Sequence, residues 1–431
     1  MEEWKEYKES PWGNIPYHWG ISSIKDETEV VTDYVANGSF ASLAENVKYK
    51  SEKDYAVLIR LVDYNNQFKG DFVYIDKDAY EFLGKSKLYG DEIIISNVGA
   101  NVGTVFKCPH LECKMSLAPN SIMVKFKGNN DFFYYWLKSR FGQHMLQSIV
   151  TGSAQPKFNK TNFRDLLIPV PPLREQERIA SILKSLDDKI EVNRRINENL
   201  EQQAQALFKS WFVDFEPFKD GEFVESELGM IPKGWRVGML DEIGDVVGGS
   251  TPSKSKPEYY TNKGIAWLTP KDLSISNNKF TAKGEIDITE EGYKSCSTKL
   301  MPKGSVLFSS RAPIGYITIA KNDICTNQGF KSVVPKLAGT AFIYYFLKIS
   351  TKDIENKATG STFKEASGAL MKSLQLIIAP ERILHDFENI MKPLFTQQEI
   401  LEDESRRLAE LRDALLPKLM SGEIKVNEVE I

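Results

Sequence analysis

The sequence predicts an α+β protein in which two tandem α/β lobes, in a pseudo-two-fold arrangement, are separated by two long helices that pair as an antiparallel coiled coil. Three observations lead to this fold class. The chain contains an internal repeat, each repeat ends in a long heptad pattern, and the remaining segments alternate short apolar runs with Gly, Pro and Asn turns.

The internal repeat is visible as three pairs of similar segments that occur in the same order. Residues 9–19 and 225–235 are identical at six of eleven positions, at an offset of 216 residues. Thr-Gly-Ser at 151–153 recurs at 359–361, at an offset of 208, and residues 96–103 resemble 309–315 more loosely. Because the offsets differ only by the length of a loop, we interpret the chain as a tandem duplication of about 210 residues.

The first heptad pattern predicts a helix from Leu173 to Phe212, beginning after two prolines. At 1.5 Å per residue this helix would be roughly 60 Å long. Its seam alternates spacings of four and three residues and includes two asparagines, which would fix the register of a partner helix. The seam consists of Ile179, Leu183, Leu186, Ile190, Asn193, Asn197, Leu200, Ala204 and Leu207.

The second heptad pattern consists of Leu394, Leu401, Leu408 and Leu415. Pro393 and Pro417 lie within it, so we expect a kinked or late-starting helix. One amphipathic helix of this length is more often a core helix, but two at matching places in a duplicated chain favour pairing. The expected domains are a first lobe over residues 1–172, a helix over 173–213, a second lobe over 214–379, a second helix over 380–422 and a tail over 423–431.

The lobes contain apolar runs of strand length at residues 55–59, 92–95, 121–124, 305–308 and 316–319. Gly, Pro and Asn turns separate these runs, and regular helices do not, so a doubly wound parallel sheet is not indicated. Short helices rich in aromatic residues are expected over residues 131–146 and 340–349.

The composition is that of a globular protein, with 42% hydrophobic and 26% charged residues among 431. We find no run of 18 apolar residues, and the N-terminus is acidic, so neither a membrane span nor a secretory signal is expected. Four cysteines (Cys108, Cys113, Cys296 and Cys325) are too few for a disulfide framework and favour a reducing cytoplasm.

The motifs of common catalytic sites are missing from the sequence. Gly84-Lys85-Ser86 ends like a phosphate loop, but Ala79 stands where that motif requires glycine. The glycine pattern of dinucleotide sites and the amino-methyltransferase signature are also missing. The segment from Cys108 to Cys113 clusters three possible zinc ligands where four are needed, so free thiols on a turn are the simpler interpretation and we expect no metal.

The formal net charge of -4 at first argues against a nucleic-acid partner, but its distribution changes that interpretation. The first lobe (residues 1–170) carries -1, the first helix (171–216) -2, the second lobe (217–379) +4 and the second helix with the tail (380–431) -5, which sum to -4. The acidic excess therefore lies on the helices. Neutral to basic lobes are compatible with contacts to phosphate.

Several loops are rich in Ser, Thr, Asn, Gln and Lys, at residues 153–162, 248–256 and 326–331. Such side chains suit base edges and phosphates, although loops of this composition are more often plain solvated surface. The resemblance below is what favours the first interpretation.

Five segments carry a resemblance to a known family: Gly-Gly-Ser-Thr-Pro-Ser at 248–253, Ser-Ser-Arg-Ala-Pro-Ile-Gly at 309–315, Thr-Asn-Gln-Gly-Phe-Lys at 326–331, Pro-Pro-Leu-Arg-Glu-Gln at 171–176 and residues 415–424. With these segments, the chain resembles along its whole length the specificity subunit of Type I restriction-modification systems. The first repeat departs from the pattern at residues 97–103. The candidate DNA contacts are Asn97, Asn101, Gln155, Lys157, Asn159, Lys160, Thr251, Ser253, Lys254, Lys256, Arg311, Asn327, Gln328, Lys331, Thr362 and Lys364.

The resemblance implies a DNA-recognition subunit that is not itself an enzyme. Two target-recognition domains would each read one half of a bipartite, asymmetric site in double-stranded DNA, and the paired helices would set the gap and dock two modification subunits. Those subunits would bring S-adenosylmethionine and adenine-N6 methylation, and restriction subunits would bring ATP and Mg²⁺, so no cofactor is expected on this chain. Two alternatives remain open: a coiled-coil scaffold that binds no DNA, and a fused enzyme with a cryptic site.

Overall fold

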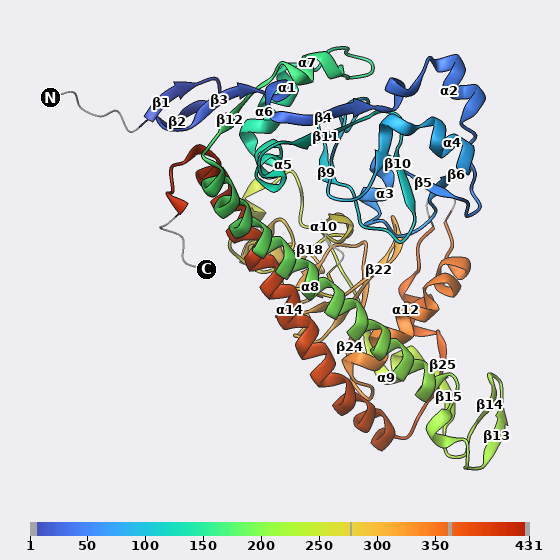
Figure 1. Ribbon diagram of the computed structural model, residues 1–431. Coiled ribbons are helices and arrows are strands. Elements are labelled where there is room, and N and C mark those ends of the chain that lie inside the picture. Colours follow the sequence, from blue (N-terminus) through green and yellow to red (C-terminus); the bar gives the residue numbers. More distant parts are fainter. Residues whose placement is uncertain (1–6, 276–277, 361–363, 427–431) are drawn as a thin grey trace. The chain divides into compact units, whose positions relative to one another are not determined.

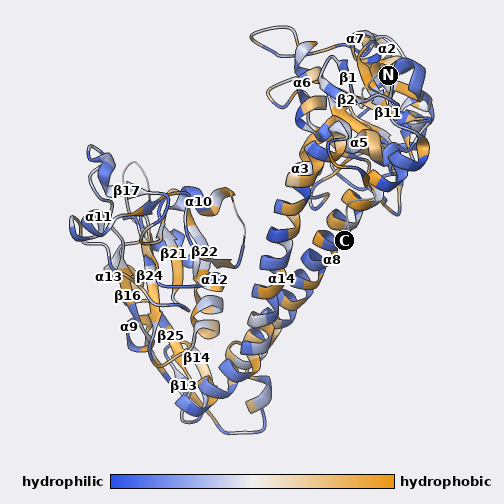
Figure 2. Cartoon of the chain, turned by 90° about the vertical axis from the view of Figure 1, so that its left-hand side faces the viewer, coloured by the Kyte–Doolittle hydropathy of each residue, from blue (hydrophilic) through white to orange (hydrophobic). Residues whose placement is uncertain are grey.

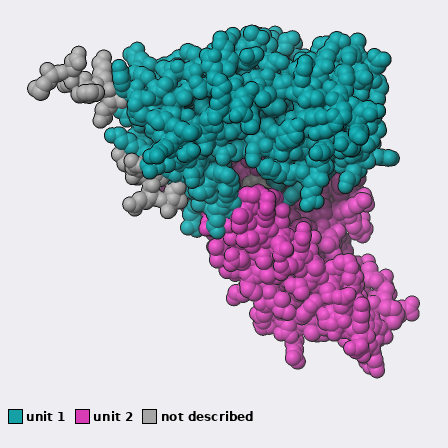
Figure 3. All heavy atoms as spheres, viewed as in Figure 1, with its two compact units in different colours: residues 1–190, 407–431 teal, residues 191–406 magenta. Residues whose placement is uncertain are grey.

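The computed structural model describes residues 7–275, 278–360 and 364–426 (Figure 1). Packing divides the chain into two compact units, which Figure 3 shows in different colours. Unit 1 contains residues 1–190 and 407–431, and unit 2 contains residues 191–406. Each unit therefore holds one lobe, called lobe 1 or lobe 2 below, together with part of each long helix.

Lobe 1 is built from short strands and helices. Its elements are β1 (Tyr7–Ser10), β2 (Gly13–Pro16), β3 (Gly20–Ser23), α1 (Ile24–Glu27), β4 (Thr28–Asp33), η1 (Tyr34–Asn37), α2 (Phe40–Asn46), β5 (Ala56–Ile59), α3 (Leu61–Asn65), β6 (Val73–Ile75), α4 (Lys77–Phe82), η2 (Gly84–Ser86), β7 (Lys87–Leu88), β8 (Ile93–Ser96), β9 (Val105–Lys107), β10 (Lys114–Leu117), β11 (Ser121–Phe126), α5 (Asn130–Lys138), α6 (Arg140–Ser148), α7 (Lys160–Arg164) and β12 (Leu167–Val170).

Lobe 1 contains two four-stranded sheets, besides the two-stranded pairs β1–β2 and β3–β12. The first has the order β4-β11-β8-β9 and is antiparallel throughout, and the second has the order β6-β5-β10-β7, with β5 and β10 parallel. Strand β8 is buried on both faces, because Ile93, Ile94 and Ile95 have no exposed surface. Asn129 caps α5 by accepting a hydrogen bond from the Phe132 amide at 2.9 Å. Trp136 of α5 is buried in the same hydrophobic cluster as Ile93 and Ile95 of β8.

Lobe 2 has a similar succession of elements. They are η3 (Glu216–Phe218), β13 (Phe223–Ser226), β14 (Gly229–Pro232), β15 (Arg236–Met239), α9 (Leu240–Ile243), β16 (Gly244–Gly248), η4 (Pro257–Tyr259), β17 (Tyr260–Thr261), β18 (Trp267–Leu268), α10 (Pro270–Ile275), β19 (Phe280–Thr281), β20 (Asp287–Ile288), α11 (Glu290–Lys294), β21 (Val306–Ser310), β22 (Ile314–Ala320), β23 (Cys325–Thr326), β24 (Lys331–Pro335), α12 (Thr340–Lys357), α13 (Gly368–Lys372) and β25 (Gln375–Ile378).

The sheet of lobe 2 repeats the topology of lobe 1. Its order β16-β24-β21-β22 matches β4-β11-β8-β9, and β19 is added at the β22 edge. The parallel pair β18–β23 matches β5–β10, and the antiparallel pair β15–β25 matches β3–β12. Hydrophobic residues are concentrated in the strands of both lobes (Figure 2). The two-lobe duplication and the α+β class that the sequence predicts are therefore confirmed.

The two long helices are α8 (Leu173–Phe212) and α14 (Glu381–Ser421), and each contributes to both units. In unit 1, Asp187 of α8 pairs with Arg412 of α14 at 2.6 Å, and Leu183 packs in the same cluster as Leu419. In unit 2, Asn193 donates a hydrogen bond to Glu404 at 2.8 Å. Residue numbers rise on one helix as they fall on the other, so the pairing is antiparallel, as predicted.

We expected the second helix to be kinked or to start late, and the late start is wrong. Helix α14 begins at Glu381 and continues through Pro393 and Pro417 without interruption. A proline removes only one backbone hydrogen bond from a helix and crowds the carbonyl four residues earlier. Pro393 lies on the exposed side, while the neighbouring Met391 and Phe395 are buried against lobe 2, so packing keeps the segment helical.

The residues predicted for helix pairing differ in burial along the two helices. Leu186, Asn193 and Leu401 are buried, whereas Asn197, Leu200, Leu207, Leu394, Leu408 and Leu415 are half-buried. The middle of the seam is polar: the Asn197 amide donates to the Gln398 carbonyl at 3.4 Å. Apolar packing is concentrated near the lobes, where the helices join the lobe cores.

Candidate nucleic-acid interface

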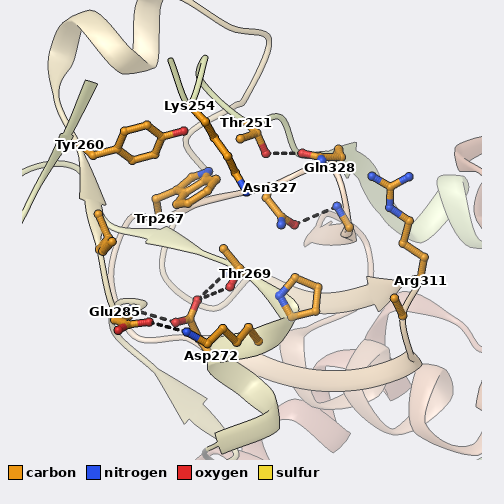
Figure 4. A pocket seen from close by; sticks show the side chains of 15 residues that line it. Thr251, Lys254, Tyr260, Trp267, Thr269, Asp272, Glu285, Arg311, Asn327 and Gln328 are labelled. Carbon is orange, nitrogen blue, oxygen red and sulfur yellow. Dashed lines mark hydrogen bonds and ion pairs between the residues drawn. The ribbon is translucent and has the colours of Figure 1, made fainter. Parts of the chain in front are cut away.

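A cavity of about 630 Å³ lies in lobe 2 where β21 ends (Figure 4). Its walls also include the loops that follow β16 and precede β24, together with residues of β17, β18 and α10 and of the segment before β20. The lining combines cations, carboxylates, neutral polar groups and two aromatic rings: Thr251, Lys254, Tyr260, Trp267, Thr269, Pro270, Lys271, Asp272, Glu285, Ile286, Arg311, Ala312, Asn327, Gln328 and Gly329. Such a lining can form hydrogen bonds of both polarities and can also stack against a planar ring.

Hydrogen bonds within the wall fix the shape of this cavity. Asp272 accepts from the Thr269 amide and hydroxyl, each at 2.7 Å, and from the Glu285 amide at 2.9 Å. Trp267 donates its indole N–H to the Ser250 carbonyl at 3.2 Å. Figure 4 shows Trp267, Thr269, Asp272 and Glu285 around one space. Because Asp272 is engaged by three donors, it acts as part of the wall.

Arg311, the first residue after β21, is held by a carboxylate. Its Nη1 lies 3.2 Å from Glu365 Oε2, and Lys331 Nζ lies 3.2 Å from the other oxygen of the same carboxylate. The Arg311 side chain keeps 37% of its surface exposed, whereas the Lys331 side chain keeps 18%. Glu365 thus orients the guanidinium while leaving part of its donor fork accessible, which is the geometry that suits a guanine edge or a phosphate.

The structure brings five of the predicted lobe 2 residues to one cavity: Thr251, Lys254, Arg311, Asn327 and Gln328. Thr251 donates its hydroxyl to the Gln328 side chain. The Asn327 side chain accepts from the Gly329 amide at 2.8 Å, so it shapes the turn before β24.

The other lobe 2 predictions lie outside the lining. Ser253 and Lys256 are exposed on the loop after β16, and a hydrogen bond to Tyr259 raises the pKa of Lys256. Lys364 is exposed and donates to the Glu355 carbonyl at 3.3 Å. Thr362 lies outside the described residues.

In lobe 1 the predicted residues are more dispersed. Asn97 donates its amide to the Phe158 carbonyl at 3.1 Å, and Asn159 caps α7 by accepting from the Asn162 amide at 2.7 Å. Lys160 pairs with Asp33 at 3.1 Å. Asn101, Gln155 and Lys157 are exposed on the loops after β8 and before α7.

Lobe 1 has its own cavity, of about 620 Å³, and sequence reasoning missed most of it. Its lining is mainly apolar and aromatic: Asp33, Tyr34, Val35, Phe40, Leu43, Ala44, Val47, Tyr49, Asn97, Val98, Pro119, Asn120 and Ser121. Asn97 is the only one of the predicted DNA contacts among these residues. Apolar residues such as these are typical of a core, so nothing in the sequence marks them as the lining of a cavity.

A second repeated motif also escaped the sequence analysis. Residues 132–138 and 342–348 read Phe-Phe-Tyr-Tyr-Trp-Leu-Lys and Phe-Ile-Tyr-Tyr-Phe-Leu-Lys, which match at five of seven positions. In unit 1 the Tyr135 hydroxyl donates to Asp187 of α8 at 2.8 Å, and in unit 2 the Tyr345 hydroxyl donates to Glu201 of α8 at 2.8 Å. The motif therefore ties each lobe to the same long helix, and an offset of 210 would have revealed it.

The described residues were also compared with the requirements of a metal site, a reactive thiol and a membrane span. Among the described residues, no three His, Cys, Asp or Glu side chains gather as a metal site. Burial raises the pKa of the Cys108 thiol well above its usual range and that of Cys325 to about 11, so both thiols stay protonated. In the described part of the chain no helix combines the length and apolarity that a membrane span requires.

Two lobes of one topology, each with a cavity at the same strand end and each tied to a shared pair of long helices, define a duplicated recognition protein. Comparison with known proteins gives the family. The sequence profile of the Type I restriction modification DNA specificity domain matches residues 19–202 and 232–409, so the chain belongs to the family of Type I restriction-modification specificity subunits. The matched domain is a DNA-recognition domain, so the chain is a recognition subunit and not a catalytic one.

Relatives match the chain over nearly its whole length. It is 28% identical to the Type I restriction enzyme MjaIX specificity subunit of Methanocaldococcus jannaschii, covering 98% of each chain. It is also 28% identical to the HindI specificity subunit of Haemophilus influenzae, covering 98% of this chain and 100% of that one. The crystal structure of an S subunit from M. genitalium superposes with a TM-score of 0.59 at 15% identity, over 93% of this chain and 96% of that chain, which shows a shared fold.

Proposed function

We propose that this subunit reads a bipartite, asymmetric site in double-stranded DNA, one half-site with each lobe. The proposal rests on one observation: a cavity lies at the same strand end in both lobes, but the two linings differ in chemistry. Identical linings would favour a symmetric site, because the same side chains would contact the same bases. Unlike linings on a duplicated scaffold favour two different half-sites.

In this proposal, the paired helices α8 and α14 set the gap between half-sites and dock two modification subunits, which restriction subunits join. Methyl transfer to adenine N6 with S-adenosylmethionine belongs to the modification subunits, and ATP and Mg²⁺ belong to the restriction subunits. The sequence supports this division, since it contains neither a phosphate loop nor a methyltransferase signature. All four cysteines are free thiols, which fits action in the cytoplasm.

Salt dependence of DNA binding tests the proposal. The full chain should be co-expressed and purified with the modification subunits. This complex should bind duplex DNA with an affinity that falls steeply as the salt concentration rises, because cationic side chains that contact phosphates release counterions and high salt makes that release less favourable. Adenines methylated in the co-expressing cells should then map to two different half-sites at a fixed spacing. A complex with no salt-dependent DNA affinity would instead support the alternative of a protein-binding scaffold.

A further inference from the structure

Two backbone correspondences show that the two cavities occupy the same place in the duplicated topology. Asp33 pairs with Ile122 in lobe 1 as Gly248 pairs with Lys331 in lobe 2, so the segments that follow β4 and β16 correspond. The backbone amide of Asn97 donates to the backbone carbonyl of Asn120, and the backbone amide of Ser310 donates to the backbone carbonyl of Gly329. The residues that follow Asn97 and Ser310, Val98 and Arg311, therefore stand at equivalent positions.

The turn that faces this strand end corresponds as well. Lys157 bridges to Thr151 in lobe 1, and Glu365 bridges to Thr359 in lobe 2, with amide-to-carbonyl distances of 2.9 Å in both. The residue after the strand end and the residue on the turn differ in charge between the two lobes. Lobe 2 places the cation on the strand end, as Arg311, and the anion on the turn, whereas lobe 1 places an apolar side chain on the strand end and the cation Lys157 on the turn.

The segment of the cavity wall that follows β4 in lobe 1 and β16 in lobe 2 also differs: it is polar and basic in lobe 2 and apolar in lobe 1. In lobe 2 it supplies Thr251 and Lys254, and in lobe 1 it supplies Tyr34, Val35 and Phe40. Phe40 is 82% exposed, although it is the first residue of α2 and lines the cavity. A large apolar side chain that stays open to water at a recognition site is available for contact with a ligand.

Among the described residues that line it, the lobe 1 cavity carries no unpaired negative charge that would repel DNA. Asp33 is the single carboxylate of its lining, and Lys160 pairs with it at 3.1 Å. Lys157 on the facing turn is exposed and has no ion-pair partner among the described residues, so it can contact a phosphate. The surroundings thus offer an apolar surface beside a free cation.

We infer that lobe 1 selects its half-site by apolar contact with the C5-methyl group of a thymine, made by Phe40 and Val98, whereas lobe 2 selects by hydrogen bonds from Arg311 and its neighbours. The C5-methyl group is the one apolar feature that a base pair presents in the major groove, and an apolar side chain is its usual partner. The inference rests on the proposed function and adds the chemistry of one half-site to it.

Deoxyuridine is the probe, because it lacks only the methyl group and keeps the pairing of thymine. The complex with modification subunits first selects sites from a random duplex library, and the half-site whose preference changes in Phe40→Ala is assigned to lobe 1. Each thymine of that half-site is then replaced by deoxyuridine. We expect one replacement to weaken binding about fourfold, the effect of one buried methyl group. The Phe40→Ala complex should discriminate less between the two duplexes, because only Val98 would still contact the methyl group.

Tyr89→Ala is the matched control, since Tyr89 is another exposed aromatic residue of lobe 1, at 72%, and does not line the cavity. It should keep the fourfold discrimination, and so should Phe40→Leu, which retains an apolar side chain. A lobe 1 half-site without thymine, or equal binding of thymine and deoxyuridine duplexes by the unmodified complex, overturns the inference but leaves the proposed function standing. A library that yields no preferred sequence overturns both.

Discussion

Arg311 shows how one residue can be both anchored and available. Glu365 holds one arm of its guanidinium at 3.2 Å, and Lys331 shares that carboxylate, so the negative charge of Glu365 is divided between two cations. The cluster keeps a net positive charge at the cavity wall. A guanidinium that is oriented before binding loses less conformational entropy when it contacts DNA.

Replacing Arg311 with alanine should therefore weaken binding to the preferred site about tenfold or more, the cost of losing a base contact. The change should relax the preference at one position of the lobe 2 half-site and leave the lobe 1 half-site as it was. Competition binding against a panel of single-base variants measures both effects. Lys303→Ala is the control, because Lys303 is a cation of the same lobe with a 67% exposed side chain outside the cavity. An unchanged panel for Arg311→Ala would place the reading site elsewhere.

At the scale of elements, lobe 2 is fastened to both long helices around one buried cation. Lys279, just before β19, donates 2.8 Å hydrogen bonds to Glu201 of α8, Tyr345 of α12 and Gln398 of α14. Its ammonium also lies 3.7 Å from the ring centre of Phe395. Burial lowers the pKa of Lys279 to about 8, against the opposing effect of Glu201, so it remains charged at neutral pH.

Glu402 of α14 belongs to the same junction and makes it sensitive to pH. It accepts from the amides of Lys279 and Phe280 at 2.8 and 3.2 Å, and burial raises its pKa from 4.5 to about 7. Because the folded state holds this proton more tightly than the unfolded state, its contribution to stability is complete below pH 4.5 and is lost as pH rises through 7.

We therefore expect unit 2 to lose about 2 kcal/mol of unfolding free energy between pH 5 and pH 7.5 through this group. Glu402→Gln should flatten that dependence, since the amide does not titrate and its oxygen can still accept from the Lys279 backbone amide, the shorter of the two hydrogen bonds. Denaturant unfolding across this pH range measures the slope. Asp403→Asn on the same helix should leave the slope unchanged. Burial raises the pKa of Asp403, but its ion pairs with Lys321 and Arg406 outweigh that effect, so its pKa is lowered and it stays ionised throughout. An equal slope in Glu402→Gln would assign the effect to other groups.

Patterns that are local in sequence were predictable, and those that depend on tertiary contacts were not. Leucines seven residues apart identified α14, and three isoleucines in a row identified β8, because periodicity and burial act within one element. Lys279 looks like any surface lysine until Glu201, 78 positions away, is placed beside it. Phe40 looks like a core residue in the sequence, and only the folded structure shows that it lines a cavity.

At the scale of the whole molecule, the helix pair can be altered without touching either lobe. Asn193 and Glu404 face each other at 2.8 Å, so a seven-residue insertion beside each keeps the seam of both helices in phase. The insertion lengthens each helix by about 10.5 Å, which corresponds to about three base pairs of DNA. The methylated half-sites should keep their sequences while the gap grows by that amount, as mapping of methylated adenines would show. A heptad added to α8 alone should disrupt the pairing and abolish methylation. A gap that stayed the same with both insertions would mean that something other than these helices sets the spacing.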